Sequence, residues 1–128
     1  MNVVDSSAWL EYFGDGPNAS VFAKAIEKPD ELLVPTLTLY EVFKRTYQLA
    51  GETTALDAVA VMMQGTVIDL SSSLAIHSAR MSLESGLAMA DAIILATSRS
   101  QDAVLWTQDA HFEGLEKVEF HRKQETPD

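Results

Sequence analysis

The sequence predicts an α/β domain of three layers, with a central, mostly parallel sheet of four to five short strands and helices on both faces. Two observations predict it. Short apolar runs alternate with segments whose apolar residues recur every three or four positions, the pattern of strands linked by helices. The chain has 128 residues, the size of one domain, and 47% of them are hydrophobic, enough for a core without cross-links.

Turn and capping residues set the boundaries of the predicted elements. Apolar runs between turn residues predict strands over residues 2–4, 32–34, 66–70, 103–106 and 118–120. Helical spacing between capping residues and glycines predicts helices over residues 8–13, 18–27, 36–51, 53–65, 71–84 and 88–100. Strands therefore alternate with helices or helix pairs, and right-handed crossovers between parallel strands are expected.

The spacing of apolar residues also predicts which face of two long helices packs on the core. In the helix that begins at Thr36 or Thr38, residues three or four apart form one face: Leu39, Val42, Phe43, Thr46, Leu49 and Ala50. In the next helix, which begins at Thr53 or Thr54, the corresponding face is Leu56, Val59, Ala60 and Met63. We expect both faces to be buried.

One domain is expected over residues 1–121, followed by a polar tail over residues 122–128 that lacks a core pattern and should fray. The absence of cysteine excludes a disulfide framework, a thiolate nucleophile and a zinc site with cysteine ligands. Neither a signal-peptide pattern nor an apolar run near the roughly 20 residues that span a bilayer is found. A cytoplasmic protein without a membrane segment is therefore expected.

Four acidic residues are predicted to meet at one edge of this sheet. Asp5 follows the first strand, and Glu41 lies early in the helix after the second. Asp91 opens the helix before the fourth strand, which Asp109 follows. The carboxyl ends of parallel strands share an edge with the first turns of the helices, and ligands bind there. Carboxylates that converge at this edge repel one another unless cations intervene, and such oxygen ligands suit Mg²⁺ or Mn²⁺.

Each acid also has an ordinary structural explanation. Asp5 and Asp109 could cap helix starts, and Asp91 could favour a helix N-terminus through the helix dipole. Glu41 could form an exposed ion pair with Arg45, four residues further on. The apolar sequence on both sides of Asp91 favours a functional role there, because buried acids need partners.

The charge balance limits how this protein can bind nucleic acid. Nineteen acidic and nine basic residues give a net charge of −10. Nucleic-acid-binding proteins usually present a basic surface to phosphates, so extensive groove binding is not expected. Bound cations would reverse the electrostatic potential at the four acids, and the remaining acidic surface could attract a basic partner.

Four segments, in this order, resemble the PIN-domain nucleases, particularly the VapC-like toxins of bacteria and archaea. They are Val3-Val4-Asp5-Ser6-Ser7-Ala8-Trp9, Tyr40-Glu41-Val42, Met89-Ala90-Asp91-Ala92-Ile93-Ile94-Leu95-Ala96, and Trp106-Thr107-Gln108-Asp109 with Phe112. The resemblance covers nearly the whole chain. It implies a Rossmann-like PIN fold and an Mg²⁺- or Mn²⁺-dependent endoribonuclease, with acidic positions at Asp5, Glu41, Asp91 and Asp109.

The resemblance also implies supporting residues and partners. Ser7 and Thr107 match positions whose hydroxyls often support the acidic site. Family members are often homodimers, and a cognate antitoxin protein often silences them by inserting a segment into the active-site groove. We therefore expect the toxin of a type II toxin-antitoxin pair that acts on RNA.

The expected chemistry is metal-assisted hydrolysis. Asp5, Asp91 and Asp109 are expected to be the main metal ligands, and Glu41 to bind directly or through a water. The cation would lower the pKa of a water that attacks phosphorus in line, leaving a 5′-phosphate and a 3′-hydroxyl.

Two basic residues near Glu41 are candidate contacts to substrate. Lys44 and Arg45 follow it on the same predicted helix and could touch RNA phosphates. The alternative for both is an ordinary solvated helix face with an ion pair.

Other function classes have weaker support. The three histidines share no metal-ligand spacing, and His111 is interpreted as an exposed loop residue, although an Asp-x-His pair with Asp109 is conceivable. Phosphoryl transfer through an aspartyl intermediate would need a second acid where Ser7 stands. A receiver-like signalling module, with a hydroxyl at Thr107, would need a lysine after the last strand near the acids. Lys117 precedes the last predicted strand and so lies at the opposite edge. A non-catalytic PIN-like interaction module with an acidic cation pocket stays open.

Overall fold

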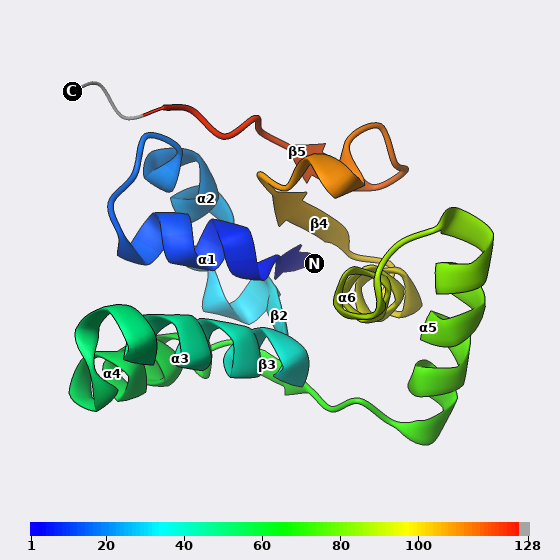
Figure 1. Ribbon diagram of the computed structural model, residues 1–128, viewed down its shortest axis with the longest axis horizontal. Helices are drawn as coiled ribbons and strands as arrows, with labels where there is room; N and C mark the ends of the chain where they lie inside the picture. Colours follow the sequence, from blue (N-terminus) through cyan, green and yellow to red (C-terminus); the bar gives the residue numbers. More distant parts are fainter. Residues whose placement is uncertain (126–128) are drawn as a thin grey trace.

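A parallel sheet of five strands forms the centre of the computed structural model, which describes residues 1–125 (Figure 1). The strand order is β3-β2-β1-β4-β5, and each neighbouring pair runs parallel. The strands are β1 (Asn2–Val4), β2 (Leu32–Pro35), β3 (Thr66–Ile68), β4 (Val104–Thr107) and β5 (Val118–Phe120). The predicted α/β architecture with a parallel sheet is confirmed.

Every predicted helix is present, with ends displaced by a few residues at most. The helices are α1 (Ser6–Phe13), α2 (Ala19–Ile26), α3 (Thr36–Ala50), α4 (Glu52–Met62), α5 (Ser72–Ser85) and α6 (Met89–Ser100), with the short 3₁₀ turns η1 (Pro29–Glu31) and η2 (Ala110–Phe112). Ser71 caps α5 as expected, because its Oγ accepts a hydrogen bond of 3.2 Å from the backbone of Leu74. Gly51 ends α3 with a positive φ of 88° that other residues adopt only with strain.

Two apolar layers cover the two faces of the sheet. Neighbouring strand residues alternate between them, so Val4 packs into one layer and Val3 into the other. The first layer includes residues of α1, α2, α3 and α4, and the second includes residues of α5 and α6. Figure 1 shows α5 and α6 together on the side of the sheet away from α1 and α3.

The predicted core faces of α3 and α4 need correction. On α3, Val42 and Thr46 are buried as expected, but Leu49 is 67% exposed. On α4 the buried residues are Ala55, Ala58 and Met62, whereas three of the four predicted ones are exposed: Leu56, Ala60 and Met63. Helices α3 and α4 pack on each other, and the small alanines at their contact allow the close approach. Several apolar residues of α4 therefore remain on its outer face.

The chain after β5 lies against the start of α2. The buried Asn18 side chain donates to the carbonyl of Arg122 at 3.0 Å, and Gln124 donates to Asn18 Oδ1 at 3.1 Å. This part of the expected tail is therefore anchored, contrary to the expected fraying, because Asn18 needs polar partners and does not cap α2 with its side chain. Residues 126–128 of the tail lie outside the described residues. In the described residues no helix is long and apolar enough to cross a membrane.

The topology creates a crevice at the carboxyl ends of β1 and β4. After β1 the chain crosses to β2 on one side, whereas β4 lies on the other side of β1. Open parallel sheets bind ligands at this reversal of strand order, outside the carboxyl ends of the strands. The backbone N–H of Asp5 continues the β1–β4 pairing by donating to the carbonyl of Trp106 at 2.9 Å. Asp5 is thereby fixed at the mouth of the crevice.

Candidate active site

Asp5 lies at the centre of a buried set of hydrogen bonds at this crevice. Only 4% of the residue is exposed. Ser7 Oγ and Thr107 Oγ1 both donate to Asp5 Oδ2, at 2.8 and 2.9 Å. Thr107 Oγ1 also accepts from the backbone N–H of Asp109 at 2.9 Å, so one hydroxyl joins the ends of β1 and β4. Ser7 and Thr107 therefore stand where the sequence predicted hydroxyls, and their part in catalysis stays a prediction.

Burial raises the pKa of the Asp5 carboxyl from 3.8 to about 6. The hydrogen bonds from Ser7 and Thr107 act in the opposite direction, and the negative charge of Asp109 raises the pKa further. Within residues 1–125, Asp5 takes part in no ion pair with a basic side chain. The carboxylate is thus placed where a cation would favour its charged form.

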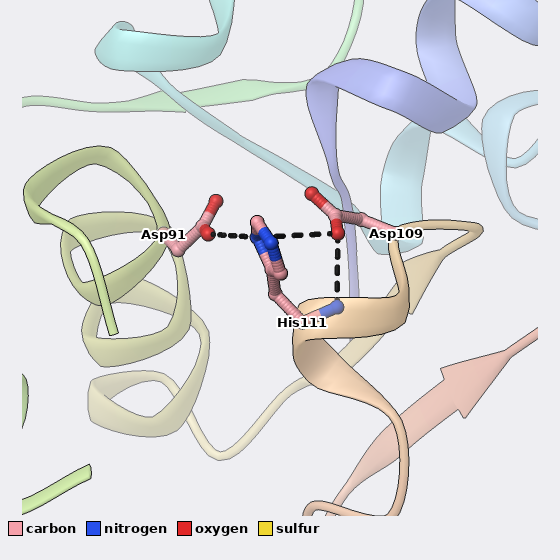
Figure 2. A group of neighbouring side chains, drawn as sticks. All are labelled: Asp91, Asp109 and His111. Carbon is pink, nitrogen blue, oxygen red and sulfur yellow. Dashed lines mark hydrogen bonds and ion pairs between the residues drawn. The ribbon is translucent and has the colours of Figure 1, made fainter. Parts of the chain in front are cut away.

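Asp91, Asp109 and His111 form a compact cluster next to this crevice. One ligand atom from each lies within 4.8 Å of the others. His111 Nδ1 is 3.0 Å from Asp91 Oδ2 and 3.4 Å from Asp109 Oδ1, and Figure 2 shows the imidazole between the two carboxylates. The Asp109 carboxylate also accepts from the backbone of His111 at 2.9 Å and so caps η2. Helix α6 and the turn after β4 therefore bring together residues 18 positions apart along the chain.

His111 belongs to this cluster, although the sequence led to its interpretation as an exposed loop residue outside the site. Its side chain is 69% exposed, as expected for a loop, yet it contacts both aspartates. The Asp-x-His spacing to Asp109 was the pattern that could have identified it. The hydrogen bond to Asp91 and then the charges of Asp109 and Asp91 raise the pKa of His111. A protonated imidazole can therefore act as a counter-ion between the carboxylates.

Glu41 approaches the site from α3. Its Oε1 accepts from Ser6 Oγ at 2.7 Å, and Ser6 is the neighbour of Asp5 at the start of α1. The alternative ion pair between Glu41 and Arg45 does not form in the described part of the chain. The sequence did not identify Ser6, whose place beside Glu41 depends on the packing of α1 against α3.

The two predicted substrate contacts lie outside this network. Lys44 and Arg45 are exposed on α3, and the Lys44 ammonium lies 5.7 Å from the centre of the Tyr40 ring. No ion pair joins either residue to a carboxylate within residues 1–125. Both are accordingly available to an anionic ligand that reaches α3.

The lysine that a receiver-like module would need lies elsewhere. Lys117 directly precedes β5 and forms an ion pair with Asp102, which directly precedes Ala103 and β4. Both residues are at the amino ends of their strands, opposite the acidic edge. Lys117 therefore does not supply the lysine of a receiver-like arrangement.

The donor set fits a small divalent cation. Carboxylate oxygens are the ligands that Mg²⁺ and Mn²⁺ prefer, and an imidazole nitrogen is compatible with Mn²⁺. Ligands at about 2.1 Å from an octahedral ion are about 3–4 Å apart. Carboxylate oxygens of Asp91 and Asp109 lie within 4.8 Å of each other, close to this spacing, so both fit as ligands of one ion.

Comparisons with known proteins agree with this architecture. A family model described as PIN domain matches residues 3–118. Comparison with curated protein sequences gave no match. Several solved structures are similar, and at identities below 25% they show the fold alone.

Three of these structures illustrate the likeness. A toxin-antitoxin complex from Klebsiella pneumoniae has a TM-score of 0.81 at 22% identity, covering 97% of this chain and 100% of that one. VapC20 of Mycobacterium tuberculosis, described as a toxin that cleaves the sarcin-ricin loop, has a TM-score of 0.76 at 17% identity, covering 91% of this chain and 95% of that one. DNA-bound VapBC from Salmonella typhimurium has a TM-score of 0.73 at 15% identity, covering 95% of this chain and 97% of that one.

Proposed function

Because the chain belongs to the PIN domain family, we propose that it is a metal-dependent endoribonuclease that hydrolyses RNA phosphodiester bonds. The observation that supports the proposal is that Asp91 of α6, Asp5 after β1 and Asp109 after β4 lie at one edge of the sheet, with Glu41 bonded to Ser6 beside Asp5. Asp91 and Asp109 lie together with His111, and Thr107 links Asp5 to the backbone of Asp109. A VapC toxin described as cleaving the sarcin-ricin loop has a similar fold.

The residues proposed to hold Mg²⁺ or Mn²⁺ are Asp5, Asp91 and Asp109, with Glu41 bound directly or through a water. When bound, the cation would supply an acidified water as nucleophile and would offset the charge that develops on the phosphate. Ser7 and Thr107 fix the orientation of the Asp5 carboxylate, and Ser6 fixes that of Glu41. Where Glu41 binds through a water, its carboxylate is proposed to accept a proton from that water as the water attacks phosphorus.

RNA would be held in part by α3. Lys44 and Arg45 lie on the turn of α3 that follows Glu41, and they are proposed to contact phosphates. With a net charge of −10, the chain depends on such local contacts and on bound cations for affinity.

The test is cleavage of single-stranded RNA with Mn²⁺ by the unchanged chain, Asp5→Asn and Asp91→Asn. Both variants should lose activity by at least about 100-fold, since they remove an anionic ligand while keeping the side-chain shape. Asp57→Asn, the same change on the exposed face of α4, should keep full activity. Circular dichroism checks that all variants fold.

Two outcomes would count against the assignment. Unchanged cleavage by both Asp5→Asn and Asp91→Asn would show that these acids do not take part in the reaction. No metal-dependent cleavage by the unchanged chain would favour the alternative, a non-catalytic PIN-like module with an acidic cation pocket.

We further propose that the nuclease is the toxin of a type II toxin-antitoxin pair acting in the cytoplasm. Similar structures are described as toxin-antitoxin and VapBC complexes. The acidic surface suits a basic antitoxin, because opposite charges speed and orient association. Co-expression with the adjoining reading frame should yield a stable complex in which RNA cleavage is inhibited. Separate elution of the two proteins would contradict this partner.

A homodimer is proposed through the outer face of α5 and α6. Leu83 and Met89 are 87% and 74% exposed there, beside an apolar cavity of about 550 Å³ that both residues line. Exposed apolar surface of this kind usually marks a contact with another protein.

A further inference from the structure

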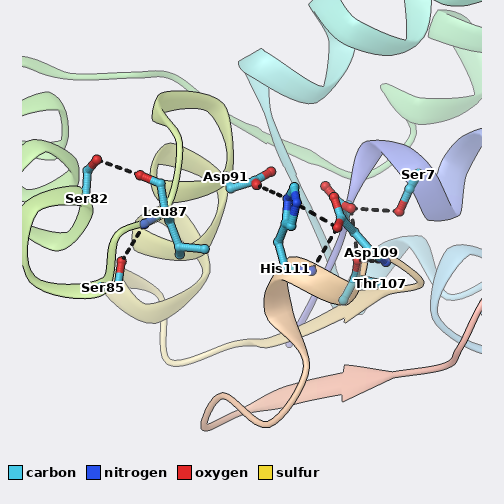
Figure 3. Close-up of polar contacts among 9 residues, drawn as sticks. Ser7, Ser82, Ser85, Leu87, Asp91, Thr107, Asp109 and His111 are labelled. Atoms are coloured by element: carbon cyan, nitrogen blue, oxygen red, sulfur yellow. Dashed lines mark hydrogen bonds and ion pairs between the residues drawn. The ribbon is translucent and has the colours of Figure 1, made fainter.

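A second cavity adjoins the acidic cluster at the turn between α5 and α6. Its volume is about 400 Å³, within the range of about 300–1,000 Å³ that is typical of small-molecule sites. It is lined by Ser85, Gly86, Leu87, Ala88, Asp91 and His111. Asp91 and His111 therefore belong both to this cavity and to the cluster (Figure 3).

One wall of the cavity is a turn held in shape by its own hydrogen bonds. Gly86 ends α5 with a φ of 77°, in the left-handed region. Ser82 Oγ donates to the carbonyl of Leu87 at 2.6 Å, and Ser85 Oγ accepts from the backbone of Leu87 at 3.3 Å. Because both serine hydroxyls are engaged in the turn, a ligand at this wall meets the carbon atoms of Leu87 and Ala88 and the backbone of the turn.

His111 also lines the cavity. The ring is largely exposed, but its Nδ1 is bonded to Asp91 and its backbone N–H is bonded to Asp109. The bond to Asp91 restrains the ring, and the bond to Asp109 holds the backbone that carries it. A fixed aromatic face favours contact with another flat ring.

The charges around the cavity argue against a phosphate as its occupant. Its charged side chains are the Asp91 carboxylate and the His111 imidazole, which are bonded to each other at 3.0 Å, and no lysine or arginine lines it. A phosphate there would therefore find no free basic side chain, whereas a neutral planar group needs none. In RNA, each phosphate is joined through a ribose to a base, and the base is a neutral planar group.

We propose that this cavity holds the base of a ribonucleotide whose phosphate lies at the acidic cluster, with the base stacked on His111. The inference deepens the proposed function and rests on it for the class of substrate. Since the serine hydroxyls of the turn are engaged, contact with the base depends on stacking more than on hydrogen bonds to its edges. All four bases should therefore be accepted.

Binding of single ribonucleotides in Mg²⁺, followed by NMR on the full chain, tests the proposal. The probes are AMP, GMP, CMP and UMP, with ribose 5-phosphate as the matched ligand that lacks a base. The nucleotides should bind about tenfold more tightly than ribose 5-phosphate, as expected for one stacked base. They should also shift the ring resonances of His111.

Three variants separate stacking from other effects. His111→Phe keeps an aromatic face and should retain most of the preference for nucleotides, whereas His111→Ala should lose it. Ala88→Phe fills the cavity and should abolish the preference without changing the affinity for ribose 5-phosphate. Ala60→Phe, the same substitution at an exposed position of α4, should change neither affinity.

Equal binding of nucleotides and ribose 5-phosphate by the unchanged chain would overturn the proposal, as would a preference that survives Ala88→Phe or His111→Ala. Its failure is distinguishable from failure of the proposed function, which is measured by RNA cleavage. If nucleotides bind more tightly than ribose 5-phosphate but RNA is not cleaved, the proposed nuclease activity fails and the base-binding cavity stands. If RNA is cleaved without this binding preference, the base-binding cavity fails and the nuclease activity stands.

Discussion

At the scale of single residues, Asp5 combines two opposing requirements. Its burial and its two hydroxyl donors hold one carboxylate oxygen in a fixed direction. The same burial makes the charged form costly in the absence of a cation, which is why the pKa rises to about 6. The burial that holds the Asp5 carboxylate in place therefore also destabilises the metal-free protein when Asp5 is charged.

This cost predicts how stability depends on pH in the metal-free chain. The pKa of Asp5 is raised from 3.8 to about 6 on folding, so the folded state holds this proton more tightly. Below pH 3.8 both states are protonated and Asp5 has no effect. As the pH rises to about 6 the contribution of Asp5 makes the protein less stable, by about 3 kcal/mol in total. Urea unfolding in EDTA measures the change.

Asp5→Asn should remove this loss and raise the free energy of unfolding above pH 6. Asp57→Asn is the control, because it removes the same charge from an exposed helix position. A pH dependence that is equal in Asp5→Asn and in the unchanged chain would show that other groups cause it. Saturating Mn²⁺ should raise the stability of the unchanged chain above pH 6 and have little effect on Asp5→Asn.

The acidic residues of the site were predictable from the sequence, but the contacts around them were not. Asp5, Asp91 and Asp109 could be placed because parallel topology returns the chain to the same edge. The His111 contact depends on η2, a three-residue turn whose direction is set by the Asp109 cap. The bond from Ser6 to Glu41 depends on how α1 meets α3. Local patterns contain no information on either.

At the scale of elements, boundaries were predicted better than faces. Capping residues and glycines are local, so Ser71, Gly51 and Gly86 located helix ends within a residue or two. The face of α4 was wrong because apolar residues occur on several sides of that helix and tertiary packing chose the side with alanines. The spacing of apolar residues cannot identify the buried face of α4, because that face is set by its contact with α3 as well as with the sheet.

Gly65, just before β3, allows the entry of that strand beside β2. A Cβ atom at Gly65 would lie 2.8 Å from the backbone carbonyl oxygen of Leu32. Gly65→Ala should therefore destabilise the protein by about 1–3 kcal/mol, because backbone must move. Thermal unfolding measures this.

Gly114→Ala provides the comparison for Gly65→Ala. Gly114 has a φ of 81° but open space around it, so only the left-handed strain of about 1 kcal/mol is expected. If Gly65→Ala were the milder of the two, the steric contact with β2 would not limit the register of β3.

At the scale of the whole molecule, the sequence determined the architecture but left the strand order open. Alternating strands and helices required a parallel sheet with two covered faces. Which strands become neighbours depends on contacts between distant segments, such as the pairing of β1 with both β2 and β4. The position of the crevice follows from that order.

The outer face of α5 and α6 gives a prediction on assembly. Leu83→Glu should convert a dimer into a monomer, measured by light scattering, because a charge would be buried at the contact. Leu49→Glu is the control, with the same change on an exposed leucine of α3. A monomer at micromolar concentration in the unchanged chain would exclude this dimer.

The bonds of Asn18 have a practical meaning for labelling and purification. Asn18 ties Arg122 to Gln108, a neighbour of the acidic site, whereas the carbonyl of Met1 pairs with Val104 at the amino end of β4. Affinity tags and fluorophores should therefore be joined ahead of Met1, where they project from the opposite edge. A label attached at Gln124, which is bonded to Asn18, would lie on the side of Gln108 and should lower RNA cleavage by obstructing the acids.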